Sequence, residues 1–228
     1  MEWREQKSEL SPYEGYARWA EQYDTDGNPL IALEGPAVAN LLGDLSGKRV
    51  LDLGCGTGRH TIVLCQKGGL VTALDQSIEM IQIAQKKLQD YNIHWVIHPL
   101  PDSLPFPDNF FSSIVAGLVA EHIQDLETLF REVSRILLRG GQFVLSALHP
   151  ERTLAGQRAR FIDPQTGLRV PIVTYHRSRE EYCHFARINH LNLRNEQTLI
   201  VDDPLADRLP RAEKYRGLAL GWVAEWVK

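Results

Sequence analysis

Residues 50–61 read VLDLGCGTGRHT, an apolar run interrupted by an acid and followed by three glycines within five residues. The run, residues 48–53, predicts a buried β-strand, and glycine lets the turn after it adopt positive φ and approach a ligand closely. Residues 59–67 have the length of a short helix, whose first backbone N–H groups would be free to bind a ligand. The stretch therefore predicts a nucleotide-like ligand at the end of the strand.

Short apolar runs alternate with amphipathic segments beyond this turn. Strands are expected at residues 70–75, 93–97, 113–118 and 142–147. Helices are expected from an N-cap at Ser77 to residue 88, and from an N-cap at Asp125 to the glycines at 140 and 141. The proline-rich segment LPDSLPFPDN, residues 100–109, is expected to be a loop. This pattern predicts an α/β fold with a doubly wound, mostly parallel sheet of seven strands, whose ligands bind beyond the carboxyl ends of the strands.

The regular alternation fails after His149. Residues 161–173, FIDPQTGLRVPIV, predict a hairpin around the turn at 163–167. A helix over 178–190 and strands over 197–201 and 218–227 would return the chain to the sheet. We therefore expect a ligand-binding core over 46–150, an inserted substrate cap over 151–195 and C-terminal strands over 196–228. Residues 1–45 are expected to form a helical lid, whose aromatic residues either pack against the core or cover the ligand.

Composition excludes several classes of protein. The net charge of −4 gives no overall attraction to nucleic acid or to an anionic membrane. The cysteines, at 55, 65 and 183, form no CxxC pair, so neither a disulfide framework nor a zinc site is predicted. No run of about eighteen apolar residues occurs, and the start MEWREQKSEL lacks the order of a signal peptide. We expect a cytoplasmic protein without a membrane partner.

The glycine spacing argues against a dinucleotide. The dinucleotide fingerprint needs G-x-G-x-x-G, whereas this turn reads G-x-G-x-G and has Arg59 where the third glycine should be. Asp75 ends the next predicted strand, where a carboxylate can accept hydrogen bonds from both hydroxyls of a ribose. The turn and this acid together indicate a nucleoside ligand other than NAD.

The segments VLDLGCGTGRH, ALDQSIEM, LPFPDNFF, EHI and RILLRGGQFVLS, in this order, resemble the class I S-adenosylmethionine (SAM)-dependent methyltransferases. The likeness is greatest to the branch of quinone-biosynthesis and other small-molecule enzymes. It implies a Rossmann-like methyltransferase fold, SAM as the cofactor, and a small-molecule acceptor methylated on oxygen, nitrogen or carbon. A tRNA or protein methyltransferase and a non-catalytic SAM-binding protein remain alternatives. Nucleic acid is less favoured as a partner than a small molecule.

The resemblance also implies a set of cofactor-binding residues. Asp52 would reach the methionine end, Asp75 would bind the ribose, and Gln76 and Met80 would lie against the adenine. The other expected contacts are Gly54, Cys55, Gly56, Gly58, Leu100, Pro101 and Gly117. Leu100 and Pro101 stand where the family commonly has G-D-A, and proline has no N–H to offer the adenine. We therefore expect weaker cofactor binding.

Methyl transfer is an in-line displacement that demands no metal, and no cluster of metal ligands is evident. An acceptor hydroxyl would benefit from a general base, for which histidine has a suitable pKa. The candidates are His122 and His149, which follow predicted strands, and His176 from the cap. The cap is also rich in arginine, which forms either a solvated face or a site for a carboxylate, a phosphate or RNA.

Overall fold

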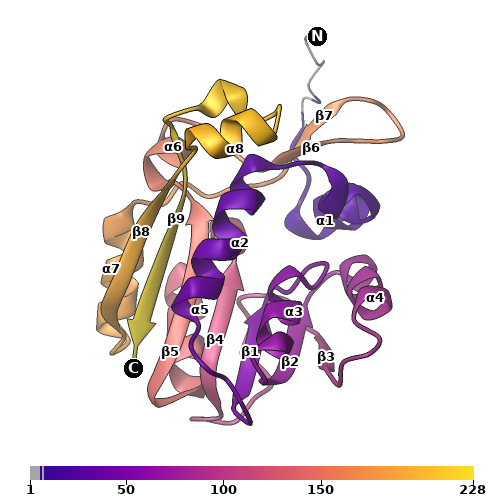
Figure 1. The fold of residues 1–228 in the computed structure, drawn as a ribbon. Helices are drawn as coiled ribbons and strands as arrows, with labels where there is room; N and C mark the ends of the chain where they lie inside the picture. The colour runs from indigo at the N-terminus through magenta and orange to yellow at the C-terminus, as the bar shows by residue number, and fades with distance from the viewer. Residues whose placement is uncertain (1–5, 7) are drawn as a thin grey trace.

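The computed structural model describes residue 6 and residues 8–228. The fold is built around one seven-stranded sheet (Figure 1). In spatial order the strands are β3 (His94–Ile97), β2 (Leu70–Asp75), β1 (Arg49–Leu53), β4 (Phe111–Gly117), β5 (Leu137–Leu148), β9 (Ala219–Val227) and β8 (Asn192–Ile200). Neighbouring strands from β3 to β5 pair in parallel, and β9 is antiparallel to both β5 and β8. The predicted doubly wound, mostly parallel sheet is confirmed.

Helices cover both faces of the sheet, because its central strands present apolar side chains on both sides. One face packs against α2 (Pro29–Leu41) and α3 (Arg59–Gln66), and the other packs against α5 (Leu126–Ile136) and α7 (Arg179–Ile188). The helix α4 (Ile78–Lys87) follows β2. Ser77, Asp125 and Ser178 cap α4, α5 and α7 through their side chains, the first two as predicted. Within the part of the chain that the structure describes, no helix has the length and apolarity to cross a membrane.

Two predicted boundaries were wrong. The helix α5 ends at Ile136, before the glycines that were expected to end it, because Leu137 is fully buried and pairs with Phe111 as the first residue of β5. Gly140 has a φ of 74° and lies where the pairing of β4 and β5 shifts its register. The strand β8 begins at Asn192 instead of residue 197, since pairing with β9 extends it although its side chains are mostly exposed.

The N-terminal segments and the hairpin after β5 lie over the carboxyl ends of the parallel strands (Figure 1). The helix α1 (Pro12–Trp19) and the 3-10 segment η1 (Ala20–Thr25) lie beside the predicted hairpin, now seen as β6 (Arg160–Ile162) and β7 (Arg169–Pro171). Trp19 stacks on Phe161 with ring centroids 5.4 Å apart, which joins the two segments. Residues 1–5 and 7, part of the start tested for a signal sequence, fall outside the described residues.

The sequence prediction did not separate α2 from the N-terminal lid. This helix contains Gly35 and Pro36 and has little amphipathic character, so its periodicity is weak. It packs against β5 and β9, while α1 and η1 lie over the sheet end. Short segments complete the chain, namely η2 (Ala120–His122), α6 (Pro150–Leu154), α8 (Asp203–Arg208) and η3 (Glu213–Tyr215).

Candidate active site

The glycine turn folds back over the end of β2. The N–H groups of Gly54 and Cys55 both donate to the carbonyl oxygen of Leu74, at 2.8 and 2.9 Å. Gly54 has a φ of 75°, and a Cβ there would lie 2.1 Å from the side chain of Val119. Gly56 also has positive φ, and open space surrounds the place where its Cβ would be. The turn therefore needs glycine for packing at the first position, and leaves its backbone open to a ligand at the second.

Asp75, the last residue of β2, lies directly beneath this turn. One carboxylate oxygen accepts a hydrogen bond from Gly56 N at 2.8 Å, and the other accepts one from Ser77 N at 2.9 Å. Burial raises the pKa of this carboxyl, although these hydrogen bonds oppose the shift. Each oxygen keeps a further lone pair, so Asp75 can still accept bonds from two ribose hydroxyls.

A cavity of about 360 Å³ opens in front of the turn and Asp75, and we call it the cofactor cavity. Of the expected cofactor residues, it is lined by Gly54, Gly56, Asp75, Gln76, Met80, Leu100, Pro101 and Gly117. Tyr13 and Tyr16 of α1 and Tyr23 of η1 form its opposite wall. The size suits a nucleoside-sized ligand, and the apolar walls with one buried carboxylate suit adenosine. These residues therefore fit the expected cofactor.

The other three expected cofactor residues do not line the cavity. Asp52 is buried and accepts a hydrogen bond from the Thr61 hydroxyl at 2.6 Å. Cys55 packs in a small apolar cluster behind the turn. Gly58 begins α3 with a φ of 83°, and a Cβ there would lie 2.8 Å from Leu88 of the segment after α4. These residues shape the turn from behind.

His122 faces the cofactor cavity, but both of its ring nitrogens are engaged. Its Nδ1 lies 2.7 Å from the carbonyl oxygen of Val173, which can only accept, so Nδ1 carries the proton. Its Nε2 therefore accepts from the Tyr16 hydroxyl at 2.9 Å. Burial lowers the pKa of His122 to about 4, so the ring is neutral near pH 7. The ring fixes Tyr16 at the cavity wall.

The other two candidate histidines lie elsewhere. His149 lines a separate hollow together with Arg179 and Glu196. His176 is exposed and lines none of the cavities described within residues 8–228. Its neighbour Tyr175, however, reaches the cofactor cavity. Of the three predicted histidines, only His122 is thus brought together with the cofactor residues.

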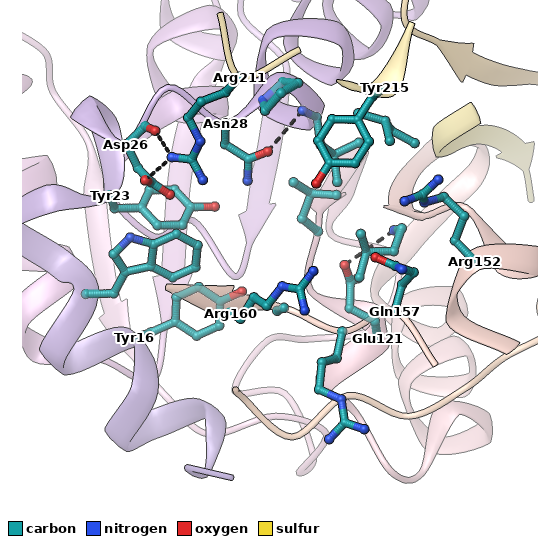
Figure 2. Close-up of a pocket in the computed structure, with 18 of the residues that line it drawn as sticks. Tyr16, Tyr23, Asp26, Asn28, Glu121, Arg152, Gln157, Arg160, Arg211 and Tyr215 are labelled. Carbon is teal, nitrogen blue, oxygen red and sulfur yellow. Dashed lines mark hydrogen bonds and ion pairs between the residues drawn. The ribbon is translucent and has the colours of Figure 1, made fainter. Parts of the chain in front are cut away.

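A second cavity of about 150 Å³, which we call the side pocket, adjoins the first and shares Tyr16, Tyr23 and Leu118 with it (Figure 2). Glu121 lines the side pocket although only 2% of the residue is exposed. One of its carboxyl oxygens accepts a hydrogen bond from Leu148 N at 3.4 Å, and the other has no partner among the described residues. Burial raises the pKa of Glu121 to about 7.

Sequence reasoning missed Glu121, although the signal was present. It immediately precedes His122 in the EHI segment that follows β4. A buried carboxyl group that has one oxygen without a partner among the described residues, and a pKa raised to about 7, is typical of a functional group. Glu121 is therefore a stronger candidate for a general base than any of the three histidines.

A buried ionic network lies beneath Gly117 in the floor of the cofactor cavity. Glu34 of α2 is fully buried and accepts hydrogen bonds from His60 at 2.8 Å, from Arg59 and from Ser146. Burial alone would raise the pKa of Glu34, but these partners outweigh it and hold the pKa at about 2. A Cβ on Gly117 would lie 2.4 Å from the His60 ring, so the network requires glycine there.

Curated relatives in sequence, and several solved structures with a similar fold, are methyltransferases. A family model described as a methyltransferase domain matches residues 51–145. An uncharacterized methyltransferase of Emericella nidulans is 30% identical over 199 residues, which cover 71% of this chain and 69% of that protein. A demethylmenaquinone methyltransferase of Tropheryma whipplei is 32% identical over 146 residues, covering 61% of this chain and 60% of that protein.

Solved structures show the same fold. A SAM-dependent methyltransferase from Mesorhizobium loti superposes with a TM-score of 0.73 over 88% of this chain and 100% of that one, at 22% identity. The expected family and cofactor are thus confirmed by sequence and fold together. The chain belongs to the class I SAM-dependent methyltransferases.

Proposed function

We propose that this methyltransferase transfers the methyl group of SAM to a small-molecule acceptor bound in the side pocket. The observation that carries the proposal is the junction of the two cavities at Tyr16, Tyr23 and Leu118. Because the cavities share these residues, an acceptor in the side pocket is next to the cofactor cavity. The side pocket, of about 150 Å³, has room for a compact acceptor group.

SAM, when bound, supplies a methyl group on a sulfonium centre that is already electrophilic. The task of this chain is to hold both reactants and to exclude water. Asp75 would hold the ribose, and the open backbone at Gly56 would allow close approach of the cofactor. Tyr16 and Tyr23 cover both cavities from the lid side. Aligned positioning of this kind can contribute about 7–11 kcal/mol.

Glu121 would accept the proton of an acceptor hydroxyl or amine during transfer. Its pKa of about 7 is close to the value at which a carboxylate is both available and basic enough. His122 then has a different task from the one expected for it. Since its acceptor nitrogen is bonded to the Tyr16 hydroxyl, it positions Tyr16 at the junction of the two cavities.

The relatives named demethylmenaquinone methyltransferases support a small-molecule acceptor, although the chain spans only about 60% of the Tropheryma whipplei protein. A tRNA or protein methyltransferase remains the second candidate, carried by the arginines of the cap. The two candidates differ in the fraction of a cell extract that receives the methyl group.

The test incubates the purified chain with methyl-labelled SAM and a cell extract, and then separates small molecules, RNA and protein. Label is expected in the small-molecule fraction, and Asp75→Asn should reduce it strongly when labelled SAM is supplied below its saturating concentration. Asp90→Asn is the matched control, because Asp90 is exposed and lies outside both cavities. Label confined to RNA or protein would favour the second candidate, and binding of SAM without any transfer would contradict both.

A further inference from the structure

The side pocket contains more positive charge than its own carboxylates can balance. Five cationic side chains line it, namely Arg152, Arg158, Arg160, Arg211 and Lys214. Arg158 forms an ion pair with Glu9, and Arg211 forms one with Asp26. Within residues 8–228, neither the Arg152 nor the Arg160 guanidinium has a hydrogen-bond or ion-pair partner. Two of the pocket's guanidinium groups are thus available to a ligand.

These two guanidinium groups come from separate segments and approach the pocket from different sides. Arg160 belongs to β6, and its side chain extends between the wall formed by Tyr16 and the wall formed by Glu121 (Figure 2). Arg152 belongs to α6, and its guanidinium carbon lies 5.5 Å from the centre of the Tyr215 ring. Both arginines are half-buried.

Half-burial removes part of the water around a charged group without supplying a counter-charge. A ligand anion would provide that charge, and the planar guanidinium forms paired hydrogen bonds with carboxylate and phosphate oxygens. Glu121 does not fill this role, because its carboxyl oxygens either bond to Leu148 N or have no partner among the described residues. The opposite wall, formed by Tyr16, Trp19 and Tyr23, offers aromatic surface for an apolar part of the same ligand.

We infer that the side pocket selects an anionic acceptor, whose carboxylate or phosphate group binds Arg152 and Arg160 while its apolar part packs against the aromatic wall. This inference rests on the proposed function, since it assigns the acceptor to the side pocket. A carboxylate and a phosphate would both accept paired hydrogen bonds from these guanidinium groups, and the experiment distinguishes between them.

The experiment measures binding by isothermal titration calorimetry in the presence of saturating S-adenosylhomocysteine. The probes are benzoate, phenyl phosphate and the neutral benzamide, which has nearly the same size as benzoate. At least one anion should bind about tenfold or more tightly than benzamide, and Arg160→Gln and Arg152→Gln should each reduce that affinity about tenfold or more. Arg187→Gln, an exposed arginine on α7 outside both cavities, should leave the affinity unchanged.

Preference for benzoate or for phenyl phosphate would identify the anion and support the inference in either case. Equal binding of benzamide and the anions, or equal losses in Arg160→Gln and Arg187→Gln, would overturn it. Displacement of a bound anion by a short single-stranded RNA with micromolar affinity would also overturn it in favour of a nucleic-acid acceptor. S-adenosylhomocysteine titrated alone tests the cofactor site separately, so loss of anion binding with intact cofactor binding overturns only this inference.

Discussion

Replacing Glu121 with glutamine should lower the activity and remove a pH dependence from the free energy of unfolding. The wild-type protein should lose stability relative to this variant as the pH rises. The pKa of Glu121 is about 7 in the folded chain against an ordinary value of 4.5. Between these values the folded state holds a proton that the unfolded chain has lost. The unfolded state therefore binds fewer protons, and stability falls as the pH rises.

The size of this effect follows from the difference of the two pKa values. Each pKa unit corresponds to about 1.4 kcal/mol, so the wild-type protein should lose about 3 kcal/mol relative to Glu121→Gln between pH 4 and pH 8. The fixed cost of burying an amide is the same at both pH values and cancels from this comparison. Urea unfolding followed by the fluorescence of the five tryptophans measures both stabilities.

The control is Glu21→Gln, which makes the same substitution at an exposed carboxyl outside both cavities. A wild-type to Glu121→Gln difference that stays constant to within about 1 kcal/mol from pH 4 to pH 8 would refute the raised pKa. Turnover supplies the second readout. Since only the ionised carboxylate can accept a proton, the wild-type rate should rise through about pH 7 and Glu121→Gln should lose about 10²–10⁴-fold.

Three further predictions concern the cofactor cavity and its floor. Asp75→Asn should weaken S-adenosylhomocysteine binding, measured by calorimetry, about tenfold or more, because an amide N–H₂ would face the N–H of Gly56 or Ser77. An affinity equal to that of Asp90→Asn would contradict this. Glu34→Gln should lower the free energy of unfolding, measured in urea at pH 7, by about 3–5 kcal/mol. This loss should shrink as the pH falls from 4.5 toward 2, because wild-type Glu34 then becomes protonated. A loss under about 1 kcal/mol at pH 7 would be inconsistent with the network. Gly54→Ala should lower the melting temperature more than Gly140→Ala, since both glycines have positive φ but only Gly54 would bring a Cβ against another side chain; equal shifts would show that the contact does not matter.

The parts of the site that sequence predicted are those set by local chemistry. The glycine turn directly follows β1 and Asp75 is the last residue of β2, and parallel strands bring their carboxyl ends to one edge of the sheet. Predicting that the turn and Asp75 lie close together therefore required only the positions of the strands, which the apolar runs indicate. The end of α5 was missed because the buried pairing of Leu137 with Phe111 ends the helix, whereas the apolar helical periodicity includes Leu137.

Residues whose role depends on distant partners could not be found in this way. The burial of Glu34 as a carboxylate depends in part on a hydrogen bond from Ser146, which lies 112 positions away, and no local sequence pattern links the two residues. The same limit applies to the choice between histidines. His122 and His149 both come after strands, yet only His122 lines the cofactor cavity, where its ring bonds to the Tyr16 hydroxyl of α1.

This division has a consequence for how such a chain could acquire a new acceptor. On the sheet side, the cofactor cavity is lined by strand ends and the turns that follow them, such as Asp75 and the glycine turn, so changing these residues disturbs the fold as well. The side pocket instead draws Arg152, Arg160 and Tyr215 from segments outside the parallel core, and these meet only over the sheet end. Glu121 is the exception, because it lies in η2 shortly after β4 and, under the proposed function, would serve the reaction whichever anion the arginines bind. Exchanging the arginines should therefore change which acceptor binds, while the cofactor site and the base remain in place.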